Sequence, residues 1–89
     1  MTTFSAQPHR YADGKHYRAN RYRLIATEGA RKIGVGGALI VGDKVIAYAG
    51  HPELGESVAA ITKRSVAFVW GASLTEALAK IKPHLEDEL

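Results

Sequence analysis

The clearest pattern of apolar and polar positions is a pair of apolar runs, residues 38–41 and 45–49, on either side of Gly42-Asp43. Two apolar runs around a Gly-Asp pair predict a β-hairpin. Neither run alternates cleanly between apolar and polar residues. This predicts strands that are covered on both faces or that lie at a protein interface.

The segments before this hairpin are less regular. Residues 1–14 predict an irregular or weakly extended arm, because Pro8 and Asp13-Gly14 interrupt them. The run KHYRANRYRLIAT, residues 15–27, predicts a strand from its tyrosines and branched apolar residues, most clearly in its last part, YRLIAT. Glu28-Gly29 then predicts a turn.

Residues 53–70 fit two patterns. The spacing of Val58 and Ile61 fits one face of a helix, whereas the alternation in VAFVW fits a strand. We prefer a helix that begins near Leu54 and frays at VAFVW, with the strand as the alternative. Trp70 is then either a core anchor or an interface residue, and we prefer the core.

Residues 73–88 predict a second helix. Ser73-Leu74-Thr75-Glu76 is a capping box, in which the serine hydroxyl accepts from the Glu76 amide and the glutamate side chain reaches back. Pro83 lies inside the run, so a kink or an early stop is expected near Lys82. The apolar residues form a stripe at helical spacing: Leu74, Leu78, Ile81 and Leu85.

These patterns predict an α+β fold. We expect a single domain over residues 1–89, with a small antiparallel β-sheet from about the first 50 residues, followed by one or two C-terminal helices packed on one face. A chain of this length buries only about 60–65% of the surface that its unfolded form exposes. Little core is therefore left for a deep enclosed pocket.

The composition excludes several kinds of chemistry. The chain has no cysteine, which excludes disulfides, zinc-thiolate sites, iron–sulfur clusters and thiol catalysis. The start, MTTFSAQPHR, lacks the apolar core of a signal peptide, and no apolar run approaches the ~18 residues of a membrane span. We expect a cytoplasmic location, no membrane partner and no cofactor.

Two further motifs predict structure rather than chemistry. GVGGAL, residues 34–39, fails as a phosphate-binding loop, because its sixth residue is not glycine and no Lys-Ser/Thr pair follows. Its glycines predict a bulge instead. The four histidines lack the spacing of metal ligands, so no metal site is expected: His9, His16, His51 and His84.

Charge is distributed unevenly along the chain. Residues 1–35 carry seven lysines and arginines against two acidic residues, a net charge of +5, whereas residues 73–89 carry a net charge of −2. The basic-aromatic stretch that runs from His9 onward suits nucleic acid, because arginines contact phosphates and tyrosines stack on bases. The candidate nucleic-acid or anion ligands are Arg18, Arg21 and Arg23. The alternative interpretation is a solvated strand.

The chain also resembles a known enzyme family over most of its length. Thr2-Thr3, Asp13-Gly14, Arg31-Lys32-Ile33 and DKVIAYAG, residues 43–50, occur in the order seen in the N-terminal half of proteasome β-type and bacterial proteasome-like peptidases.

The resemblance implies three catalytic residues. Thr2 would be the nucleophile after removal of Met1, Lys32 the cation beside its amine, and Gly50 a backbone donor to the oxyanion hole. The chain departs from the family around Asn20-Arg21, where no acidic residue is present to pair with the lysine. The 89 residues also lack the further strands and supporting residues of the family's second half.

We therefore favour a small non-catalytic protein-binding or regulatory module, of a phage or bacterial kind, that docks a protein partner or self-associates as a homo-oligomer. Tyr48 and Trp70 are the candidate interface residues. Two alternatives stay open. One is an N-terminal-threonine hydrolase, degenerate or oligomer-dependent. The other is nucleic-acid binding through the basic N-terminal half. An enzyme is less favoured than a binding protein, because the catalytic complement is sparse.

Overall fold

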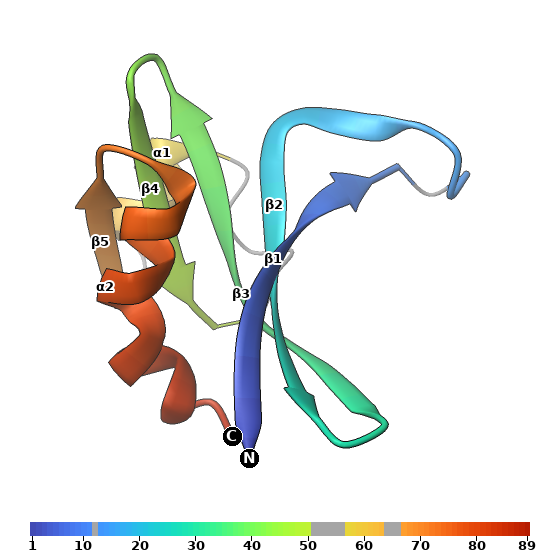
Figure 1. The fold of residues 1–89 in the computed structure, drawn as a ribbon. Coiled ribbons are helices and arrows are strands. Elements are labelled where there is room, and N and C mark those ends of the chain that lie inside the picture. Colours follow the sequence, from blue (N-terminus) through green and yellow to red (C-terminus); the bar gives the residue numbers. More distant parts are fainter. Residues whose placement is uncertain (12, 51–56, 64–66) are drawn as a thin grey trace.

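The structure is a computed structural model that describes residues 1–11, 13–50, 57–63 and 67–89. These residues form, in order, β1 (Thr2–Arg10), β2 (Tyr17–Glu28), β3 (Arg31–Val41), β4 (Lys44–Ala49), α1 (Val58–Lys63), β5 (Phe68–Gly71) and α2 (Leu74–Glu86). The strands form one antiparallel sheet in the order β1-β2-β3-β4-β5, and α2 packs on one of its faces (Figure 1). The predicted α+β fold is confirmed.

The predicted hairpin around Gly42-Asp43 is also confirmed. In the β3–β4 pair Val41 lies opposite Lys44, which leaves a two-residue turn between them. Gly42 has a φ of +62°, in the left-handed region that such a tight turn requires.

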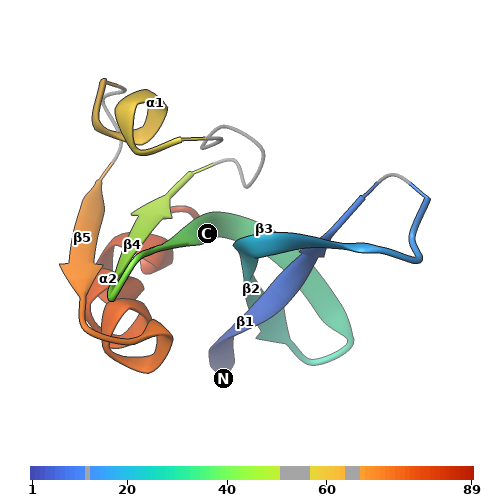
Figure 2. The same cartoon turned by 90° about the horizontal axis from the view of Figure 1, so that it is seen from above.

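Strand β4 is covered on both faces, as its apolar sequence predicts. Ile46 and Tyr48 pack with Ile61 of α1. The residues that alternate with them join the larger core beneath α2: Val45, Ala47 and Ala49. Figure 2 shows the two helices on opposite sides of β4.

The bulge predicted from the glycines lies in β3. Leu24 of β2 pairs with Gly36, and the next residue, Ile25, pairs with Gly34, so Val35 is the extra residue. A Cβ atom at Gly36 would collide with the carbonyl oxygen of Tyr48. Glycine there lets the backbones of β3 and β4 approach closely.

The arm expected over residues 1–14 is a regular strand for most of its length. Phe4 and Ala6 of β1 face the core and pack against it, while the residues that alternate with them are exposed: Thr3, Ser5 and Gln7. This alternation, together with pairing to β2, makes β1 one edge of the sheet.

The helix preferred for residues 53–70 is only partly right. Residues 58–63 are helical, but Phe68–Gly71 is a strand, and the expected start near Leu54 lies outside the described residues. In β5 the side chain of Val69 packs toward the core, whereas Phe68 and Trp70 are 39% and 38% exposed. The prediction that Trp70 anchors the core is wrong, because strand alternation turns it outward.

The predicted C-terminal helix is confirmed as α2. Its N-cap is Ser73, whose hydroxyl oxygen accepts from the Glu76 amide at 3.1 Å. The Glu76 carboxylate reaches back to the amide of Ala72, one residue before the cap. The first turn is therefore closed from both directions.

Helix α2 continues through Pro83 to Glu86, so the early stop expected near Lys82 is wrong. A proline in this position removes the hydrogen bond to the carbonyl of Ala79. Both residues are exposed, so water can satisfy that carbonyl. The stripe holds the helix on the sheet: Ile81 and Leu85 are fully buried, and Leu74 and Leu78 are partly buried.

No helix in the described part of the chain is both long enough and apolar enough to cross a membrane.

Candidate functional site

The closed end of the β1–β2 hairpin bends away from the rest of the sheet (Figure 1). Pro8 pairs with Tyr22, but the next paired residue of β1, Arg10, lies opposite Tyr17. Strand β2 therefore carries residues 18–21 opposite a single residue of β1. Such an irregularity bends a ribbon and increases its twist.

Asn20 lies in this irregular stretch with a φ of +58°. Asparagine tolerates the left-handed region better than other side chains, because its short polar group can bond locally. This residue therefore permits the bend. It also lies between the basic tip of the hairpin and the rest of the sheet.

The loop at the tip is organised by Asp13. Its Oδ1 atom accepts from the amides of Lys15 and His16 at 2.8 and 3.1 Å, and its Oδ2 atom lies 2.7 Å from Nδ1 of His16. The hydrogen bond from the His16 side chain, followed by those from the two amides, holds the pKa of Asp13 below its ordinary value. The negative charge of Asp13 is thus engaged within the loop.

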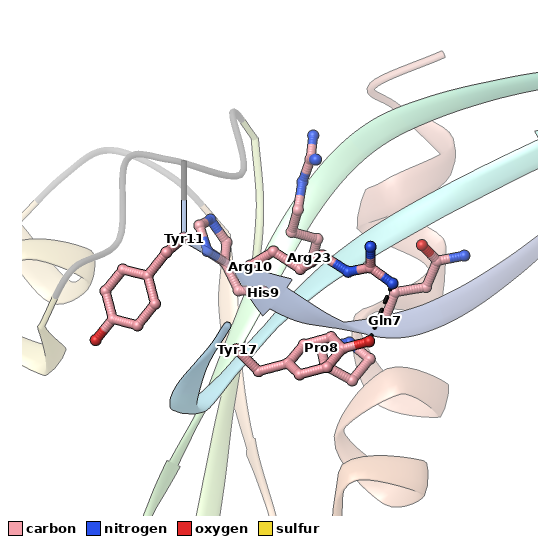
Figure 3. A pocket seen from close by; sticks show the side chains of 7 residues that line it. All are labelled: Gln7, Pro8, His9, Arg10, Tyr11, Tyr17 and Arg23. Atoms are coloured by element: carbon pink, nitrogen blue, oxygen red, sulfur yellow. Dashed lines mark hydrogen bonds between the residues drawn. The ribbon is translucent and has the colours of Figure 1, made fainter. Parts of the chain in front are cut away.

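A pocket of about 510 Å³ lies along the bend. Figure 3 shows the seven side chains that line it: Gln7, Pro8, His9, Arg10, Tyr11, Tyr17 and Arg23. Two of these residues are arginines, two are tyrosines and none is acidic. The lining therefore combines positive charge with aromatic surface.

Arg10 is held in place within this pocket. Its Nη2 atom donates to the Tyr17 hydroxyl at 3.0 Å (Figure 3). Its Nη1 atom donates to the carbonyl of Gly14 at 3.3 Å. The guanidinium carbon lies 5.0 Å from the centroid of the Tyr17 ring. Across the hairpin tip, the guanidinium of Arg18 lies 5.8 Å from the Tyr11 ring. Both distances are typical of cation–π contacts.

The structure places the three predicted arginines differently. Arg23 is exposed and lines the pocket. Arg18 is outside the lining, and its guanidinium lies over the ring of Tyr11, which is part of the lining. Arg21 is half-buried opposite Leu39 of β3, outside the lining. The contribution of Arg10 was missed. The turn at Asp13-Gly14 could have indicated it, because a turn there brings the basic and aromatic residues before it, Arg10 among them, next to those after it.

A second surface lies at the other end of the sheet, on β5. Within the described residues no strand pairs with the outer edge of β5. The amide of Ala49 donates to the carbonyl of Ala67 at 2.9 Å. Because hydrogen-bonded and non-bonded positions alternate along an antiparallel pair, Val69 also bonds to β4, and the N–H and C=O groups of Phe68 and Trp70 point to the outer edge.

The two predicted interface residues are in different environments. The side chain of Trp70, a residue of the edge strand β5, is exposed. Tyr48 is 2% exposed, and its ring lies over Gly37, where a Cβ atom would collide with the tyrosine ring and hydroxyl. The structure therefore gives Tyr48 almost no surface to offer a partner.

Thr2 and Lys32 lie on opposite faces of the sheet. Thr2 pairs with Glu28, and its hydroxyl donates to that carboxylate at 3.5 Å. Lys32 pairs with Thr27, which directly precedes Glu28 in β2. Since paired residues share a face and successive residues alternate, the two side chains point in opposite directions.

The backbone of Gly50 is hydrogen-bonded to β3. Its amide donates to the carbonyl of Val35 at 2.8 Å, and its φ is +131°, a conformation that favours glycine. This backbone geometry accounts for a glycine at the end of β4. It leaves the N–H engaged rather than directed toward a substrate.

Histidine, aspartate and glutamate form no group of three or more that could hold a metal ion within the residues the structure describes. Neither a scan against protein-family models nor searches of curated proteins and of solved structures find a match for this chain.

Proposed function

We propose that this chain is a small non-catalytic protein-binding module that self-associates through the outer edge of β5. The observation that supports this best is an edge strand whose outward backbone groups, which pair with no other strand in the described residues, belong to two exposed aromatic residues, Phe68 and Trp70. An open edge of this kind can accept a further strand.

A second copy of the chain fits this edge by symmetry. An antiparallel pair of β5 strands centred on Val69 places Phe68 of one copy opposite Trp70 of the other. Both residues direct their N–H and C=O groups outward. Each opposed pair can exchange two hydrogen bonds once the Lys80 ammonium, which lies 3.1 Å from the Trp70 carbonyl oxygen, gives up that contact. Phe68 and Trp70 lie on the same face of β5, and opposed aromatic pairs stabilise a sheet by about 0.2–1 kcal/mol each.

The same strand thus supplies both halves of an isologous interface, in which identical patches meet across a two-fold axis. Charge opposes this association only weakly, because each copy carries a net charge of +3. Dimer formation should therefore become stronger as salt is added, since salt screens the repulsion between copies.

Sedimentation velocity over a wide range of protein concentration tests the proposal. We expect a reversible monomer–dimer equilibrium. Trp70 is the only tryptophan in the chain, so its fluorescence emission should shift to shorter wavelength as the dimer forms. A chain that stays monomeric at every concentration and salt level, with unchanged Trp70 emission, would contradict it.

Two variants distinguish dimerisation through the β5 edge from non-specific association through exposed aromatic side chains. Phe68→Pro removes an outward N–H without removing a hydrogen bond to β4, and proline is tolerated at the start of an edge strand. We expect it to abolish the dimer. Tyr11→Ala is the matched control, because Tyr11 is an exposed aromatic residue far along the sheet from β5. It should leave the dimer unchanged.

A further inference from the structure

The pocket at the bend of the β1–β2 hairpin has the features of an anion site. Arg10 contributes a guanidinium whose position is set by Tyr17 and Gly14. Those two contacts use two of its five N–H donors, so three remain for a ligand. Because the side chain is already ordered, a ligand that it binds does not bear the full entropy cost of immobilising it.

Arg23 adds a second positive charge to the same pocket. It is exposed, and within the described residues it takes part in none of the hydrogen bonds or ion pairs found. The acidic residue of the adjoining loop, Asp13, is paired with His16 and does not line the pocket. Two arginines thus face this space without a lining carboxylate to neutralise them.

Tyr11 and Tyr17 supply aromatic surface beside these charges. Each is 54% exposed, a large value for an aromatic side chain. Figure 3 shows the Tyr17 ring alongside Pro8, with its hydroxyl at the Arg10 guanidinium, and Tyr11 at the other end of the group. A ring held in this way is a platform on which a flat ligand can stack.

We propose that this pocket binds single-stranded nucleic acid. Arg10 and Arg23 contact phosphates, and Tyr11 and Tyr17 stack on unpaired bases, the combination used by proteins that bind single strands without strong sequence preference. A duplex keeps its bases stacked on one another, so their faces cannot reach the tyrosines. A volume of about 510 Å³ lies within the range of pockets that hold small ligands, which suits one nucleotide and part of its neighbour.

This site is separate from the proposed dimer interface. The pocket is formed by β1 and β2 at one edge of the sheet, whereas β5 is the opposite edge. Nucleic-acid binding and self-association can therefore succeed or fail independently.

Fluorescence polarisation with labelled oligonucleotides tests the inference. The probes are a mixed-sequence single strand as DNA and as RNA, the same sequence as a duplex, and an abasic single strand of equal length. We expect either base-bearing single strand to bind more tightly than the abasic strand by roughly 5- to 100-fold per stacked base. The duplex should bind no better than the abasic strand.

Two results would overturn the inference. One is the absence of a polarisation change with any single strand at low salt. The other is equal binding of the base-bearing strand, the abasic strand and inorganic polyphosphate, which would show a general polyanion surface without base stacking.

Variants locate the binding in the pocket. Arg23→Ala should weaken binding and lower the slope of log K against log salt by about 0.7, the value for one phosphate contact to a single strand. Arg31→Ala is the matched control, because Arg31 is an exposed arginine at the far end of the β2–β3 pair and outside the lining. If both variants change the slope equally, the pocket is not the site.

Tyr11→Phe and Tyr11→Ala test stacking at the same position. The phenylalanine variant keeps an aromatic face and should retain binding, whereas the alanine variant should lose roughly 5- to 100-fold. Unchanged Trp70 emission and circular dichroism show that each variant is folded. Equal affinity of the two variants would exclude stacking on this ring.

Discussion

The Nζ atom of Lys80 lies 3.1 Å from the carbonyl oxygen of Trp70, so a side chain of α2 occupies part of the outer edge of β5. The same ammonium group lies 3.8 Å from a carboxylate oxygen of Glu76, whose other oxygen accepts from the Ala72 amide. Lysines commonly protect edge strands from pairing with other chains. Lys80 therefore limits the addition of a further strand to the outward backbone groups of Phe68 and Trp70.

Replacing Lys80 should make self-association stronger. In Lys80→Ala the Trp70 carbonyl of each copy is left for the other copy. The gain should be about 5- to 150-fold in dimer affinity, the equivalent of two net hydrogen bonds per dimer. Lys82→Ala is the control, because it removes the same charge from an exposed position on the same helix. A dimer no tighter than that of the control would contradict a guarding role for Lys80.

Asn20 should tolerate glycine but not a branched side chain. Its φ of +58° costs a side chain such as valine about 1–2 kcal/mol, whereas glycine adopts it freely. Thermal unfolding should therefore show Asn20→Val less stable than Asn20→Gly, with the nucleic-acid pocket weakened only in the valine variant. Equal stability of the two variants would mean that the bend does not depend on this conformation.

Gly37 should be coupled to Tyr48. A Cβ atom at residue 37 would meet the tyrosine ring and hydroxyl, so Gly37→Ala is expected to cost about 1–3 kcal/mol of stability through overpacking. The cost should be smaller when Tyr48→Ala has already removed the ring. Denaturant unfolding of the two single variants and the double variant measures this coupling, and strictly additive effects would contradict the packing described here.

Stability should fall at acidic pH through Asp13. The hydrogen bond from His16 and those from two amides lower its pKa from 3.8, so the folded chain binds fewer protons there than the unfolded chain. The contribution is present above pH 3.8 and is lost as the pH falls through the lowered folded pKa. An NMR titration of the Asp13 carboxyl should show this value rising in His16→Ala. The same midpoint in both proteins would exclude His16 as the main cause.

The elements that sequence patterns predicted well carry strong local signals. Gly42-Asp43 can hardly be read as anything but a turn between apolar runs, and Ser73 with Glu76 marks a helix start before any tertiary contact forms. The strand β1 has no such signal. Its inward residues are only Phe4 and Ala6, and its pairing with β2 depends on residues beyond the hairpin loop. The run VAFVW is so short that it fits both the 3.6-residue period of a helix and the two-residue period of a strand.

The candidate site was visible as composition but not as geometry. Basic and aromatic residues on both sides of Asp13-Gly14 indicated a surface for anions. The bend at Asn20 and the contact between Arg10 and Tyr17 decide which of these residues face one pocket. Neither follows from spacing alone, because both depend on how the paired strands shift in register.

Hydrogen–deuterium exchange of three backbone amides in β5 tests the central claim most directly. The Val69 amide bonds to β4 and should be protected at every protein concentration, whereas those of Phe68 and Trp70 point outward and should exchange rapidly in dilute protein. As the concentration rises and a second copy pairs with β5, the Phe68 and Trp70 amides should become protected together. Rapid exchange of both at concentrations where the chain is dimeric would show that the copies meet elsewhere.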